Sequence, residues 1–145
     1  MKTKELQEKI AANMKAWQKI ENGSIEMAAK VSKTTDNLLV RTVMAIVMQD
    51  SAMHHRVQQF IIDSFEKQAI SLQPDEVGEV WGMIEEHIAL ERKTIEFAKA
   101  ALDAIKGKKM VVQQYLLEYM LADEEKHNKL LDNLEAVKKG MYPYA

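Results

Sequence analysis

Two residues in the stretch ADEEKHNKL, Glu124 and His127, have the types and the spacing of a pair of metal ligands. They lie three residues apart, and side chains at that spacing lie on the same face of a helix. A carboxylate and an imidazole on one helix face can bind a divalent cation such as iron, manganese or zinc. The same pair is also a common surface ion pair, so the helix face on which it lies decides between the two interpretations.

The residues around this pair predict that it faces a core. Heptad steps along this segment give the apolar stripe Leu117, Met120, Glu124, His127, Leu131 and Leu134. The carboxylate and the imidazole therefore occupy two consecutive core positions, with apolar residues on both sides. We expect both side chains to point inward.

Three other segments carry ionisable residues on their apolar stripes. Glu91 is the single polar residue on one stripe, and Glu21 lies on another. Asp50 and His54 lie together on a third. Burying an unpaired carboxylate costs several kcal/mol, so buried carboxylates are protonated, paired or bound to a cation. A multivalent cation is the simplest partner for the whole set, and the predicted metal ligands are Glu21, Asp50, His54, Glu91, Glu124 and His127.

Long amphipathic helices must position these residues. The chain has two prolines and five glycines, and no segment alternates with the period of a strand. We predict an all-α fold with helices over residues 3–32, 36–68, 74–106 and 109–139. Pro74 favours a helix start and Gly107 a helix end. Four helices of similar length with short links predict one four-helix bundle domain over residues 1–140. Residues 141–145 are a predicted tail.

The two halves of the chain also resemble each other in sequence. ENGSIEMA at residues 21–28 matches ERKTIEFA at residues 91–98 at Glu, Ile, Glu and Ala, with Ser for Thr and Met for Phe. With a link three residues shorter in the first half, the same alignment pairs His54 with His127. We therefore predict two helical-hairpin repeats, each with a Glu on its first helix and a His on its second.

A Glu from each of two helices and Glu-x-x-His from each of the other two form the ligand set of ferritin-like di-iron carboxylate bundles. The chain resembles this superfamily over nearly its whole length, and its rubrerythrin and erythrin branch most closely. Glu91 followed by Glu124 and His127 carries the resemblance. It implies a ferritin-like bundle that binds non-haem iron and acts on dioxygen or peroxide. The implied activity is that of a ferroxidase or peroxidase-like oxidoreductase, without catalytic residues beyond the metal ligands and without an organic cofactor.

The first half departs from the family pattern. Ser51 stands three residues before His54, where the family has a Glu, and Asp50 stands four residues before it. Asp50 can reach the same space with a shorter side chain, so one ion or two ions per chain are both open. Thr94 replaces an additional family Glu one turn after Glu91. The link KQAISLQPDEVG between the second and third helices is short for the family's long crossover.

Composition sets further expectations. A net charge of −2 with mixed signs implies neither nucleic acid nor an anionic membrane as a partner. The absence of cysteine excludes a thiolate zinc site and the rubredoxin domain that supplies electrons in full-length rubrerythrins. Electrons would then come from a separate donor protein or from iron itself. We expect a soluble, cytoplasmic protein that forms a homodimer and binds iron, with manganese or zinc as alternatives.

Two other functions are compatible with the pattern. A dioxygen-carrying site of the hemerythrin type needs five histidines, and this chain has four. A metal-free bundle that serves as a scaffold or partner-binding module is favoured by Ser51 and by Gly23, which lies within the first predicted helix near Glu21. Loss of metal on substitution of Glu124, in a protein that stays folded, separates the metalloprotein from the scaffold.

Overall fold

The computed structural model describes residues 1–69 and 74–141, and this part of the chain contains four helices and no strand. The helices are α1 (Thr3–Thr34), α2 (Leu38–Glu66), α3 (Pro74–Ile105) and α4 (Val111–Met141). The predicted all-α class and the four predicted helices are confirmed. The predicted tail beyond Met141 and most of the link before Pro74 lie outside the described residues.

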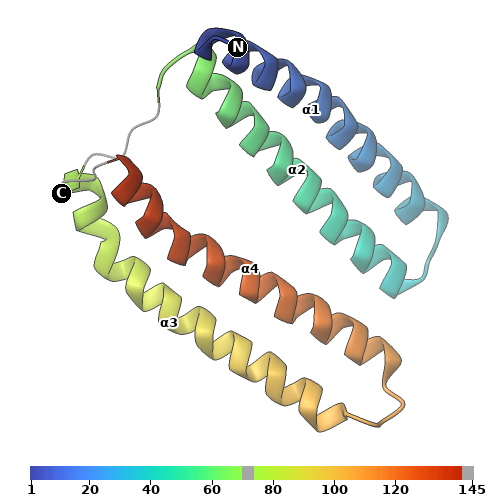
Figure 1. Ribbon diagram of the computed structural model, residues 1–145. Helices are drawn as coiled ribbons and strands as arrows, with labels where there is room; N and C mark the ends of the chain where they lie inside the picture. Colours follow the sequence, from blue (N-terminus) through green and yellow to red (C-terminus); the bar gives the residue numbers. More distant parts are fainter. Residues whose placement is uncertain (70–73, 142–145) are drawn as a thin grey trace. The chain divides into compact units, whose positions relative to one another are not determined.

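The helices form two antiparallel hairpins, α1 with α2 and α3 with α4, as Figure 1 shows. They belong to two compact units, Met1–Ile70 and Ser71–Ala145. None of the described helices contains an apolar segment of the length needed to cross a bilayer.

The link between α1 and α2 corrects two predicted helix ends. α1 continues to Thr34, two residues beyond its predicted end, and α2 begins at Leu38 rather than at residue 36. The reason is the cap, because the side-chain oxygen of Asn37 accepts a hydrogen bond from the Val40 amide at 3.1 Å. Arg41 then stabilises the turn by donating from Nε to the carbonyl oxygen of Thr35 at 2.7 Å.

The link between α3 and α4 turns at a glycine. Gly107 has a φ of 75°, and no other described residue has a positive φ. A glycine in this left-handed conformation is the usual end of a helix, so the predicted role of Gly107 is confirmed. α4 begins at Val111 rather than at residue 109, and it ends at Met141, two residues beyond its predicted end.

Each hairpin buries only a narrow stripe of residues, most of which are small or polar. In the first hairpin this stripe consists of Ala11, Glu21, Ala28, Ser51, Gln58 and Ile62. Among the side chains that the structure describes in the second hairpin, Glu91 and Ala98 are buried. Many large apolar side chains stay exposed, among them Ile20 at 70% and Phe97 at 75%. A pair of helices therefore positions the candidate ligands but leaves apolar surface beside them.

Candidate metal centre

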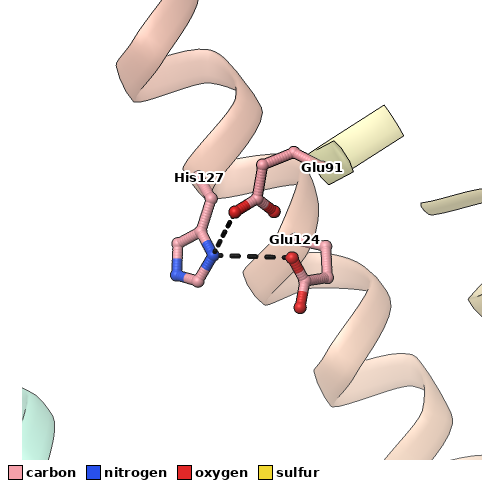
Figure 2. Close-up of side chains that lie close together, drawn as sticks. All are labelled: Glu91, Glu124 and His127. Atoms are coloured by element: carbon pink, nitrogen blue, oxygen red, sulfur yellow. Dashed lines mark ion pairs between the residues drawn. The ribbon is translucent and has the colours of Figure 1, made fainter. Parts of the chain in front are cut away.

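The second hairpin brings three of the predicted ligands together. Nδ1 of His127 lies 3.6 Å from Oε1 of Glu91 and 3.5 Å from Oε2 of Glu124. Figure 2 marks both ion pairs with dashed lines. One ligand atom of each residue lies within 4.8 Å of the other two. Within residues 1–69 and 74–141, this is the one group of three or more His, Asp or Glu side chains that is so close.

The spacing of these atoms fits a shared ion. Ligand atoms bound at about 2.1 Å from an ion lie about 3.0 Å apart in octahedral geometry and about 3.4 Å apart in tetrahedral geometry. The distances of 3.5 and 3.6 Å from His127 are therefore only slightly longer than those of a loaded site. Two carboxylates and one imidazole are a donor set that iron, manganese and zinc accept.

The two carboxyl groups of the centre affect each other's ionisation. The Glu124 carboxyl, as a hydrogen-bonding neighbour, lowers the pKa of Glu91, and the nearby imidazoles of His87 and His127 lower it further. The same contact raises the pKa of Glu124, and burial raises it further. Oε2 of Glu91 is buried and has no hydrogen-bond donor among the described residues. With both groups ionised, this carboxylate oxygen has its charge uncompensated, and a proton or a cation would compensate it.

Thr94 on α3 contacts the carboxylate of Glu124 and the backbone of Glu91. Its Oγ1 lies 2.7 Å from the carbonyl oxygen of Glu91 and 3.1 Å from Oε2 of Glu124, so its single hydroxyl proton can be donated to either. Rubrerythrins, which the sequence resembles, have an additional Glu at this position. In this chain the residue orients Glu124 and adds no negative charge.

Asp123 is a further residue of the site that the heptad stripe missed. Its Oδ2 lies 3.4 Å from Nε2 of His127, on the ring side opposite to the carboxylates. Its Oδ1 pairs with Nζ of Lys126 at 2.7 Å. A carboxylate on the outer nitrogen of a ligand histidine fixes the orientation of the ring and makes it a better donor. The available sequence signal is the spacing, because Asp123 lies four residues before His127 on the same helix face.

The first hairpin brings together only two of its three predicted ligands. Glu21 is 6% exposed, and its Oε1 lies 3.2 Å from Nδ1 of His54. Gln58 also donates from Nε2 to this oxygen at 3.5 Å. Asp50 is half-buried, and among the described residues no hydrogen bond or ion pair joins it to Glu21 or His54.

The two hairpins have matching contacts at matching positions. The Glu21–His54 contact corresponds to Glu91–His127 in the alignment of the two halves. Likewise Oγ of Ser51 lies 3.2 Å from Oγ of Ser24. In the alignment Ser51 corresponds to Glu124 and Ser24 to Thr94, and these two residues are also in contact. The departure at Ser51 therefore has a structural consequence, because a hydroxyl occupies the place of the second carboxylate.

Comparison of the chain with protein-family models, curated proteins and solved structures finds no match.

Proposed function

We propose that this chain is a non-haem metal-binding protein whose principal ion is bound by Glu91, Glu124 and His127. The observation that carries the proposal is the convergence of these three side chains, from two helices, to within 4.8 Å of one another. The near-burial of Glu91 adds to it, since a carboxylate that is 8% exposed requires a compensating charge.

Iron is the metal that the proposal favours. Carboxylate oxygens suit hard cations, and one imidazole is compatible with Fe(II), Mn(II) and Zn(II). Bound iron would supply one-electron chemistry toward dioxygen or peroxide, which is the basis of a ferroxidase or peroxidase-like activity. Three protein ligands leave coordination positions for small molecules, as in catalytic sites generally. Thr94 orients Glu124 and Asp123 orients His127, so the protein contributes a fixed set of donors.

The proposal includes a ferritin-like four-helix bundle. Each hairpin leaves large apolar residues exposed on the stretches that carry the candidate ligands: Trp17, Ile20, Met27, Met53, Val57, Met83, Leu90, Phe97, Met120 and Leu130. Full burial of one such side chain stabilises a protein by about 1.5–3 kcal/mol. Packing of the two hairpins through these side chains would supply the missing core and exclude water from the metal centre.

The first hairpin favours one ion per chain over two. It offers Glu21 and His54, but a hydroxyl at Ser51 replaces the second carboxylate. Glu21 also has polar partners within the hairpin, His54 and Gln58. This pairing is the observation that favours the second candidate function, a metal-free helical scaffold, for the first half of the chain.

The test is an anaerobic titration of chelator-stripped protein with Fe(II), in which tightly bound iron is counted per chain. We expect one ion for the natural sequence and none for Glu124→Ala, with unchanged helix content by circular dichroism. Glu125→Ala is the matched control, because Glu125 is the exposed neighbour of Glu124 on the same helix. Two ions would add Asp50 to the ligands, and no binding in a folded protein would leave the scaffold.

A further inference from the structure

A second histidine lies beside the candidate metal centre. Nε2 of His87 lies 3.0 Å from Oε1 of Glu91, the same oxygen that lies 3.6 Å from Nδ1 of His127. Two imidazoles, one from α3 and one from α4, thus converge on one carboxylate oxygen. An ion among these three groups would have two imidazoles and a carboxylate as ligands, which iron and zinc accept.

The position of His87 on α3 places its side chain beside that of Glu91. It precedes Glu91 by four residues, so the helix itself places the two side chains on one face. The separation of 3.0 Å equals that of adjacent ligand atoms in an octahedral site with bonds of about 2.1 Å. The ring of His87 lies outside the group of three that falls within 4.8 Å. Its side chain is 57% exposed, so the ring can rotate toward an ion without displacing packed neighbours.

The first hairpin provides an internal comparison. In the alignment of the two halves, the residue that corresponds to His87 is Trp17, which cannot bind a metal ion. The contact that Glu21 makes in that hairpin besides His54 is with the amide of Gln58. The second imidazole is therefore a property of the second hairpin alone, which also contains both carboxylates of the close group.

From these contacts we propose that His87 is a fourth metal ligand, which completes a mononuclear site of two histidines and two carboxylates within the α3–α4 hairpin. This inference rests on the proposed metal-binding function. The added imidazole makes the site selective, because imidazole favours zinc, iron, nickel and copper over manganese and magnesium, which prefer oxygen ligands. We expect the hairpin to discriminate between Zn(II) and Mn(II) through this residue.

The decisive experiment counts the imidazoles bound to the metal. The full chain is stripped with chelator and loaded with one equivalent of Zn(II), and X-ray absorption at the zinc edge measures the number of bound imidazole rings. We expect two in the natural sequence and one in His87→Gln. The glutamine can still donate a hydrogen bond to Glu91 but does not replace an imidazole, so this variant separates a ligand from a positioning residue. His55→Gln is the matched control, because it removes an imidazole from α2 and leaves the α3–α4 hairpin unchanged.

Affinity provides the second readout. Loss of even an outer partner of a ligand lowers metal affinity by about 10–100-fold, so His87→Gln should weaken Zn(II) binding by at least about tenfold. The affinity for Mn(II) should change less. One bound imidazole in the natural protein, or a spectrum of His87→Gln that matches the natural one, would overturn the inference and leave the three-ligand site intact. Absence of bound zinc in the folded natural protein would overturn the proposed function as well.

Discussion

Replacement of Glu124 by Gln should stabilise the metal-free protein while it removes metal binding. Glu91 and Glu124 each have an oxygen in a group whose members lie within 4.8 Å, and their side chains are only 11% and 29% exposed. Gln has nearly the same size and shape as Glu, so the packing changes little. The substitution therefore removes one of two neighbouring negative charges and leaves the rest of the site in place.

The repulsion between the two carboxylates sets the magnitude. At 4.8 Å, the upper limit on the spacing of their ligand atoms, two unit charges repel by about 1 kcal/mol in a water-like dielectric and by about 3 kcal/mol at an effective dielectric constant of about 20. We expect Glu124→Gln to raise the free energy of unfolding of the metal-free protein by about 1–3 kcal/mol at about pH 7.5.

The gain should depend on pH in a definite direction. Glu91, as hydrogen-bonding neighbour, and burial raise the pKa of Glu124 in the folded state, so its ionisation destabilises the fold as the pH rises through that pKa. Below the ordinary pKa of Glu124, 4.5, the Glu91–Glu124 pair of the natural protein carries a proton, and the repulsion between the two carboxylates is lost. The advantage of Glu124→Gln should therefore shrink between about pH 7.5 and about pH 4.

Urea denaturation followed by circular dichroism, with chelator present, measures this difference. With Zn(II) at about 100 times its dissociation constant, the natural protein should gain about 2.7 kcal/mol and the variant should gain none. Glu125→Gln controls for the loss of a charge at an exposed site. If Glu124→Gln lowers the stability of the metal-free protein, the carboxylate is a stabilising structural charge and the argument from repulsion is wrong.

Four further changes have expected outcomes. Ser51→Glu restores the second carboxylate of the first hairpin and should add a second ion to the iron titration. Gly23→Ala should stabilise α1 by about 0.5–1 kcal/mol, because a Cβ there meets no atom within 4 Å. Gly107→Ala should destabilise the protein by about 1 kcal/mol, because the φ of Gly107 is 75°. Thermal unfolding measures both effects. A hydrogen bond from Gln59 lowers the pKa of Asp63, so Asp63→Asn should reduce stability in urea denaturation near neutral pH and lose this effect as the pH falls below the ordinary value of 3.8.

The helices were predictable from the sequence because their signals are local. Apolar periodicity, Pro74 and Gly107 identify four helices whose ends differ from the prediction by at most two residues, as is usual for helix ends. The true cap of α2, Asn37, is one residue after the predicted start because the amides of that turn meet its side chain. Choosing between Asp36 and Asn37 requires the backbone conformation.

The candidate site was only partly predictable. The stripe found Glu91, Glu124 and His127 because a heptad reading selects one helix face, and the three residues lie together. It gave Asp50 the same status, although the structure shows no hydrogen bond or ion pair from Asp50 to Glu21 or His54 among the described residues. At 100° per residue, adjacent positions differ greatly in direction, so a stripe cannot decide between neighbours.

Contacts that cross the stripe were beyond a heptad reading. Asp123 contacts the outer nitrogen of His127 from beside the stripe on α4. His87 contacts Oε1 of Glu91 from beside the stripe on α3. Both lie four residues from the ligand they contact, on the same helix. Spacing of this kind is visible in the sequence, but side-chain rotamers decide whether it produces a contact.

The location of every ligand of the proposed centre on α3 and α4 affects how the protein acquires its metal. The ligands lie between residues 87 and 127, and the turn at Gly107 connects their two helices. Such a hairpin has low contact order and can form in microseconds to milliseconds, before more distant segments meet. A metal ion bound at that stage would favour the hairpin over the unfolded chain and act as a folding nucleus. The rate of folding of the chain would then depend on the concentration of free metal, even where the final structure does not.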